Sequence, residues 1–184
     1  MAITINGNGT LSGVTAGLTA SSLPSGAVLQ VQTTYNNTHI FATDTSFTDL
    51  SGMTCNITPT AASNKVLVQI SMSISKSTNH AFLGRVYRDS TLIGGGNGDQ
   101  ANHEDNVWWN IRMSSTHSAN NYSTHFVDTI PNDWSSGAIT YKVQGMITSS
   151  SGGINFGINQ TAVDGNDAHN SPSFSNIVLT EIAA

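Results

Sequence analysis

Histidines and carboxylates are the residues of this sequence best suited to hold a metal ion. His103, Glu104 and Asp105 are adjacent, while His117 and His125 fall in or beside predicted strands. Because neighbouring residues of a strand point to opposite faces, a metal cage on residues 103–105 needs a bent loop or ligands from other segments. A threefold axis that joins one histidine from each of three chains is the other source of ligands. We expect exposed or hydrogen-bonded histidines and predict no metal and no cofactor.

Two loops resemble ligand sites only in part. Residues 164–167, Asp-Gly-Asn-Asp, lack the alternating carboxylates and terminal glutamate of a calcium loop, so we expect a turn held by aspartate and asparagine side chains. The glycine-rich segment 94–98 has neither the lysine nor the following helix of a phosphate-binding loop.

Cys55 is the single cysteine, which excludes an internal disulfide. We predict that Cys55 is a small buried apolar residue.

The residues offer no convincing catalytic arrangement. The Gly-X-Ser-X-Gly motif of a nucleophile elbow is absent. Glu104 and Glu181 are the only glutamates, and Glu181 lies inside a predicted strand. Two aspartates at a suitable separation could hydrolyse a glycan, but the sequence does not define such a pair. We predict that the protein is not an enzyme and assign no catalytic residue.

Trp108 and Arg112 are the first candidates for partner binding. Alternation places Val107, Trp109, Ile111 and Met113 on the core face of a strand, and Trp108, Asn110 and Arg112 on the opposite face. An outward Trp108 beside Arg112 could stack on a sugar ring, anchor a subunit contact, or pack locally. Tryptophan and arginine are enriched where subunits meet, so we favour the subunit contact.

Trp134 is the second exposed-aromatic candidate. It lies in the loop 131–137 next to Asn132 and Asp133. Loops carry recognition residues more often than strands do. Trp134, Asn132 and Asp133 therefore form a candidate glycan contact.

The composition narrows the classes of partner. Charged side chains make up 9% of the 184 residues, against roughly 25% in an average soluble domain. Six basic and eleven acidic residues give a net charge of −5, while serine (24), threonine (22) and asparagine (19) must cover the surface. Such a surface gives little repulsion between copies, which fits a protein that sits against neighbours or is exposed outside a cell.

The same composition argues against three other classes. Scattered cations on an acidic chain make nucleic acid a poor partner. No apolar run of about 18 residues is present, so no helix is expected to insert into a membrane. No cationic start precedes an apolar stretch, so we expect no secretory signal.

Alternating apolar and polar residues predict strand after strand and minimal helix. The best pattern spans Lys65–Ser75, with Ile139–Thr148 next. Weaker candidates are Ala27–Thr33, His39–Leu50, Met53–Thr58, Ala81–Arg88, Val107–Ser115, Tyr122–Ile130, Ile154–Ile158 and Phe174–Ile182, with a hairpin turn at Arg88–Thr91. Ten short strands separated by glycine, asparagine, serine and proline predict an all-β, antiparallel, jelly-roll-like β-sandwich with an extended N-terminal arm.

The last predicted strand is apolar on both faces, apart from Thr180 and Glu181. Ile177 and Leu179 face one way, and Val178 and Ile182 the other. A central strand covered by a neighbouring chain explains this pattern, and so does an ordinary strand that is covered on both sides within its own chain.

Residues 1–26 differ from the rest and are predicted to be an arm, with the sandwich over 27–184. They contain no charge and five glycines. A free tail is one interpretation. We favour an arm that orders on a partner, because aliphatic residues recur in it. The residues expected to be buried there are Ile3, Ile5, Leu11, Val14 and Leu18.

Six segments together resemble a known class of protein. They are residues 23–31 (LPSGAVLQV), 63–68 (SNKVLV), 86–94 (VYRDSTLIG), 126–129 (FVDT), 139–144 (ITYKVQ) and 177–182 (IVLTEI). In this order and spacing the chain, from about residue 23 to its end, resembles small virion structural and tail-fibre proteins of tailed bacteriophages, especially of marine and cyanobacterial hosts. The resemblance implies a jelly-roll-like sandwich on a virus particle, often as a homotrimer, and brings no catalytic residues.

These observations predict a virion protein assembled in the host cytoplasm. The favoured function is a compact tail-fibre or tail-attached component that docks through its arm. Related stretches often sit at the C-terminal end of much longer fibres, whereas this chain has only a short arm, which argues against a long fibre. A capsid-decorating protein and a host-glycan-binding recognition module are the alternatives. The expected partners are sister subunits, a tail adaptor or capsid protein, and in the third case a host-surface glycan.

Overall fold

The computed structural model describes ten segments of the chain. They are residues 4–5, 11–12, 23–42, 44–76, 81–94, 107–112, 119–131, 133–148, 156–160 and 173–184. These residues form strands, turns and bends, without a helix, so the predicted all-β class is confirmed. In this described part of the chain there is accordingly no helix that could span a membrane.

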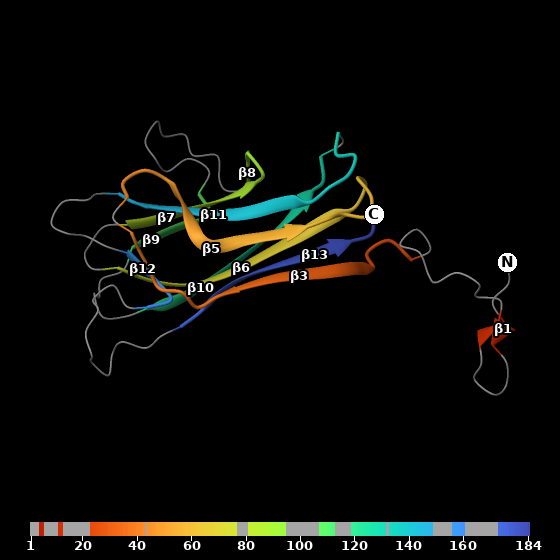
Figure 1. Ribbon diagram of the computed structural model, residues 1–184, viewed down its shortest axis with the longest axis horizontal. Coiled ribbons are helices and arrows are strands. Elements are labelled where there is room, and N and C mark those ends of the chain that lie inside the picture. Colours follow the sequence, from red (N-terminus) through yellow and green to blue (C-terminus); the bar gives the residue numbers. More distant parts are fainter. Residues whose placement is uncertain are drawn as a thin grey trace.

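Two packed antiparallel sheets make up the body (Figure 1). The β6 sheet consists, in spatial order, of β10 (Asn120–Thr129), β6 (Lys65–Lys76), β13 (Ser175–Ile182) with β12 (Phe156–Ile158), and β3 (Val28–Asn36) with β4 (Ile40–Ala42). The β11 sheet consists of β5 (Thr48–Ile57), β11 (Ile139–Ile147), β7 (Ala81–Arg88), and then β8 (Thr91–Ile93) and β9 (Trp109–Arg112) along one edge of β7. The two sheets form the predicted β-sandwich.

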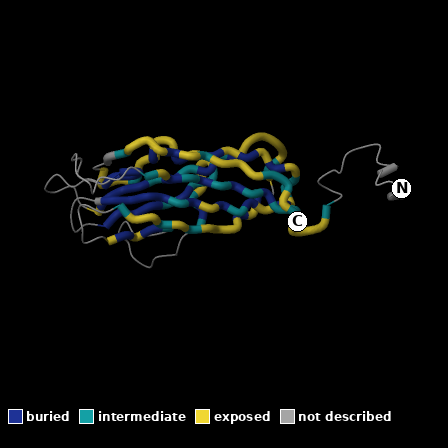
Figure 2. The backbone as a smooth tube through the Cα atoms, turned by 90° about the horizontal axis from the view of Figure 1, so that it is seen from below, coloured by how far each residue is buried: buried dark blue, intermediate teal, exposed yellow. Residues whose placement is uncertain are grey.

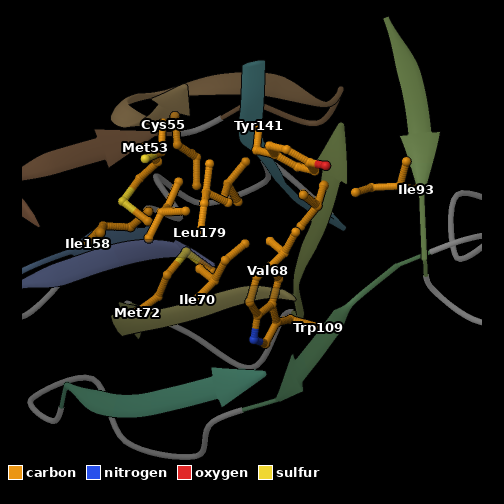
Figure 3. Close-up of a cluster of buried hydrophobic side chains, with 14 of the residues drawn as sticks. Met53, Cys55, Val68, Ile70, Met72, Ile93, Trp109, Tyr141, Ile158 and Leu179 are labelled. Atoms are coloured by element: carbon orange, nitrogen blue, oxygen red, sulfur yellow. The ribbon is translucent and has the colours of Figure 1, made fainter. Parts of the chain in front are cut away.

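Strand alternation builds the core between the sheets. Val66, Val68, Ile70, Met72 and Ile74 of β6 are buried, and they face Ile139, Tyr141, Val143 and Ile147 of β11. Figure 3 shows Ile70, Met72 and Leu179 on the side of the core opposite Met53, Cys55 and Tyr141. Cys55 is buried and unpaired, as predicted. Each fully buried aliphatic side chain contributes about 1.5–3 kcal/mol to folding.

A pair of glycines makes room for one large core ring. Gly84 of β7 and Gly145 of β11 lie directly opposite each other. A Cβ at Gly145 would lie 2.7 Å from Phe82 Cε2, and one at Gly84 would lie 2.7 Å from Trp109 Cε3. The aromatic rings of Phe82 and Trp109 therefore occupy the space that side chains at these glycines would fill.

Two strand boundaries differ from the prediction. The expected strand His39–Leu50 is wrong, because β4 ends at Ala42 and β5 begins at Thr48. The expected break near Gly52 is also wrong, since β5 continues through it. Gly52 has φ +74°, and the pairing of β5 with β11 shifts register there, which identifies a β-bulge rather than a loop.

The hairpin predicted at Arg88–Thr91 is confirmed, and it leads into a strand that was not expected. Asp89 has φ 51° and accepts a hydrogen bond from Thr140 N at 2.9 Å through its Oδ1. The chain then returns along β7 as β8. Short strands of this kind carry too few residues for alternation to reveal them.

The predicted arm contains two short strands that were also not expected. β1 (Thr4–Ile5) and β2 (Leu11–Ser12) pair with each other in a sheet separate from the sandwich. Ile3, Val14 and Leu18 lie outside the described residues.

The chain enters the sandwich beside its own C-terminal segment. Gly26 N donates to Ala183 O at 2.9 Å, and Ala183 N donates to Ala27 O at the same distance. Lys65 and Thr129 are paired at this end, which we call the arm end and which carries the C label in Figure 1.

The opposite end of the sandwich is marked by the ends of β6 and β9. Lys76 is paired with Phe156 there, and Ala81 with Arg112. β6 and β9 therefore both end at the side of the sandwich far from the arm end.

Candidate functional site

The two outer faces of the sandwich differ in charge. On the β11 sheet, Lys142 Nζ lies 2.7 Å from Asp49 Oδ2, and Arg85 Nε donates to Gln144 Oε1 at 3.0 Å. The hydrogen bonds from Lys142 and then Gln144 hold the pKa of the Asp49 carboxyl below its ordinary value. The Arg85 guanidinium also lies 3.9 Å from the centre of the Phe47 ring. Lys142 and Asp49 thus form an ion pair on this face, and Arg85 is held by Gln144 and the Phe47 ring.

The outer face of the β6 sheet is almost free of charge. It is formed by alternate residues of β10, β6, β13 and β3, and Lys65 is the only formally charged one that the described strands place there. Figure 2 shows exposed residues along the rims of the body and at the turns near the C-terminus, with buried residues between them. Such a face repels neither a neutral ligand nor another copy of itself.

The half of this face nearest the arm end carries five aliphatic residues. We call Val28, Val31, Leu67, Val127 and Ile182 the apolar patch; they lie in two adjacent rows that also contain Lys65, Thr129 and Thr180. Val28 is 59% exposed, Val31 51% and Val127 47%. Isolated exposed aliphatic residues are common, but contiguous ones mark interaction surfaces.

The other half of the face is a polar trough on β6. Two adjoining hollows of about 280 and 270 Å³ meet at Ser71. Their lining consists of Gln69, Ile70, Ser71, Asn121, Ser123, Thr124, His125, Ser173, Phe174, Asn176 and Val178. The hydroxyls of Ser71 and Ser123 share a hydrogen bond across the trough.

An exposed aromatic pair stands at one end of the trough. The rings of Tyr35 and Phe174 have centres 5.2 Å apart, and the two residues are 62% and 53% exposed. Tyr35 lies opposite Asn176 in the β3–β13 ladder, so the pair adjoins the polar lining. The sequence did not indicate this site, because its residues come from four segments that only the fold brings together.

The expectation that Trp108 points away from the core is wrong. Trp108 is partly buried against the core, and its Nε1 donates to Ile93 O at 2.6 Å. Its ring packs edge-on against Phe126 of the other sheet, with centres 5.8 Å apart. A Cβ at Gly94, whose φ is +56°, would lie 2.8 Å from this indole. Trp108 is thus packed locally, and it closes one side of the sandwich.

The remaining predicted residues do not converge with Trp108 into one site. Arg112 is exposed at the loop end of β9, as its place in the alternation predicts. Trp134 is half-buried against the core and its Nε1 donates to Gly137 O at 3.3 Å, so it is less exposed than expected. Asp133 is exposed beside it, and Asn132 lies outside the described residues.

A buried ion pair joins the two sheets near the arm end. Arg88 Nη1 donates to both carboxylate oxygens of Asp128, at 2.7 and 2.8 Å, and Tyr141 Oη donates to Asp128 Oδ2 at 2.8 Å. Burial, followed by the charge of Asp128, raises the pKa of the Tyr141 phenol far above its ordinary value. These three residues are held to one another, which identifies a structural cluster.

Glu181 is a second buried carboxylate, and it faces the core. Its oxygens accept from Gln30 Nε2 at 2.7 Å, Thr60 N at 2.7 Å, Thr60 Oγ1 at 2.9 Å and Asn64 Nδ2 at 2.6 Å. Burial alone would raise the pKa of this carboxyl, but the four donors outweigh it and hold the pKa below the ordinary value. Glu181 therefore fastens β3 and the β5–β6 connection to β13.

The metal-ligand candidates fall mostly outside the described residues. This applies to His103, Glu104, Asp105, His117 and the segment 164–167. His125 is exposed on the outer face of β10 and lines the polar trough. Within the described segments, no group of three or more histidine, cysteine or acidic residues could hold a metal ion.

Comparison with known proteins adds no relative. No family model matches the chain, and no curated protein matches its sequence.

Proposed function

We propose that the chain is a non-enzymatic structural component of a bacteriophage particle, a compact tail-fibre or tail-attached protein. It docks through residues 1–26 and displays the sandwich. The observation that carries the proposal is the apolar patch, which adjoins the point where residues 1–26 join the body. Gly26 is tied to Ala183, next to Ile182 of the patch.

In the proposal the apolar patch and the arm act together, because the patch lies next to the point where residues 1–26 join the body. Lys65 is the one charged residue that the described strands place beside the patch, which presents exposed Val28, Val31 and Val127. Burying such side chains on another protein is favourable, and the absence of like charges removes the penalty for contact between copies. Sister subunits of a homotrimer are the occupants we assign to the patch, and a tail adaptor is the partner of the arm.

We also infer that the sandwich is a jelly roll. Its rows run β3–β13–β6–β10 in one sheet and β5–β11–β7 with β8 and β9 in the other. Between β4 and β12 the chain changes sheet from row to row, except that β7, β8 and β9 follow one another within one sheet. This connectivity supports a double-sheet jelly roll, an architecture used by viral capsid and lectin domains. It agrees with the architecture that the sequence resemblance implies.

The number of copies per particle tests the proposal. Particles are purified from an infected host whose phage encodes this chain, and the chain is quantified by mass spectrometry against a major capsid protein of known copy number. We expect a few to a few dozen copies, in line with the symmetry of a tail. Hundreds of copies would instead identify a capsid-decorating protein, and absence from the particles would contradict the proposal.

A further inference from the structure

We infer that the polar trough on the β6 sheet binds a neutral oligosaccharide. The inference does not depend on the particle location proposed above, because it rests on the trough alone. At neutral pH none of the residues that line the two hollows carries a formal charge, with His125 counted as neutral. An acidic ligand such as a phosphate or a sulfated sugar therefore finds no counter-charge in the lining.

The lining matches the hydrogen-bonding needs of sugar hydroxyls. Gln69 and Asn176 each present an amide with both donors and an acceptor, while Ser71, Ser123 and His125 present groups that can donate or accept. A hydroxyl needs both a donor and an acceptor nearby, so this mixture suits a polyhydroxylated ligand better than a purely accepting or donating one. A few convergent polar groups in a hollow are typical of a small-molecule site.

The aromatic pair supplies the apolar part of the same recognition. One face of a sugar ring carries mainly C–H groups, which pack on the flat surface of an aromatic ring. Tyr35 and Phe174 offer such a surface at the end of the trough next to Asn176. Exposed aromatic rings with this area are costly to leave in water, which favours a ligand that covers them.

The trough differs from the apolar patch on the same face, so its occupant is a ligand rather than a second copy. The patch is aliphatic, whereas the trough is hollowed and lined mainly by hydroxyl, amide and imidazole groups. Interfaces between copies depend on apolar centres more than on polar hollows. The trough begins one row from the patch, at Gln69, His125 and Val178, and extends away from the arm end.

A glycan array of neutral and acidic oligosaccharides, probed with the full chain, tests the inference. We expect retention of neutral glycans, and calorimetry with a retained glycan should show affinity lowered by about tenfold or more in F174A and in N176A. The matched control is V31A, on the same face but in the apolar patch, which should bind like the wild type. Because all three side chains lie at the surface, thermal unfolding should change little among the variants.

A charge substitution gives a second readout that a merely structural effect would not move. Q69K places a cation in the trough and should add retention of sialylated or sulfated glycans, whereas V127K should not. Failure to retain any neutral glycan, or equal loss of affinity in V31A, would overturn the inference. So would an oligomer in light scattering that F174A converts to a monomer, since a second copy would then fill the trough. A chain that binds glycans but is absent from particles would contradict only the proposed function.

Discussion

At the residue scale, Glu181 is the buried group whose charge matters most for stability. Its pKa is held below the ordinary value of 4.5 by four donors. A carboxyl with a lowered folded pKa stabilises the protein at pH values above the unfolded pKa, and this stabilisation is lost as the pH falls through the folded pKa. The free energy of unfolding should therefore be flat near neutrality and decrease below about pH 4.5.

The E181Q variant tests whether Glu181 causes the predicted decrease in the free energy of unfolding at low pH. Glutamine replaces one of the two carboxylate oxygens with an NH₂ group, which then faces either the Gln30 donor or the donors of Thr60 and Asn64. We therefore expect a loss of about 2–4 kcal/mol at pH 7 and a smaller loss at low pH. Urea unfolding at several pH values measures the loss of unfolding free energy at pH 7 and at low pH. D49N is the control, because the exposed Asp49–Lys142 pair should contribute at most about 1 kcal/mol. Equal pH profiles for E181Q and the wild type would show that Glu181 is not the titrating group.

Tyr141 should remain un-ionised in the folded protein at alkaline pH. An ordinary tyrosine ionises near pH 10, whereas burial and the neighbouring Asp128 raise the pKa of this phenol well above that. Its contribution to stability is complete below about pH 10 and declines above it, because the unfolded chain ionises first.

Tyrosinate absorbance measures the prediction directly. Y141F should give the same tyrosinate titration curve as the wild type below the unfolding pH. Y141F should also unfold more easily by about 2 kcal/mol, since Asp128 loses a donor. A smaller titration amplitude in folded Y141F would mean that Tyr141 ionises in the native state.

The sequence could indicate these residues only in part. Alternation showed that Glu181 lies inside the last strand, but not that it faces the core. Its donors come from residues 30, 60 and 64, which are distant in the chain. For Trp108, strand alternation predicts the wrong side of the strand. Its ring packs on the core, where it contacts Gly94 and donates to Ile93 O.

At the element scale, the strands with clean alternation were predictable, and those shaped by tertiary contacts were not. β6, β7 and β11 match their predicted ranges closely, because each has a largely apolar inner face. The sequence predicts two strands where β5 is continuous, because glycine next to serine at Gly52 indicates a turn unless the neighbouring strand is known. The polar trough was also unpredictable, since it needs the register of β10, β6 and β13.

The glycine pair of β7 and β11 should be sensitive to a single methyl group. In G145A the new Cβ would lie 2.7 Å from Phe82 Cε2 and 3.1 Å from Leu50 Cδ2, so we expect destabilisation by about 1–3 kcal/mol. Thermal or urea unfolding measures the destabilisation of G145A relative to the wild type. S136A, in an exposed turn, is the control, and F82L should recover part of the loss in G145A. An unchanged midpoint for G145A would contradict the tight packing of the Phe82 ring.

At the scale of the whole molecule, the two proposals assign different roles to two parts of one face. The apolar patch adjoins Gly26 at the arm end, while the polar trough lies further toward the opposite end. Under the proposed function the arm alone would be a weak anchor, because ordering its backbone costs more than five aliphatic side chains return. Attachment therefore needs the patch, backbone pairing with the partner, or repetition of the contact by symmetry.

Deletion of residues 1–22 tests the central claim most directly. The deleted and full-length chains are supplied separately to particles that lack the native copy, and incorporation is quantified by mass spectrometry after circular dichroism and urea unfolding have checked that both sandwiches fold. A full-length chain in which Ile3, Ile5, Leu11, Val14 and Leu18 are replaced by serine is the matched control for length. The account predicts a folded sandwich that is lost from the particles in both variants. Normal incorporation of the deleted chain would contradict it.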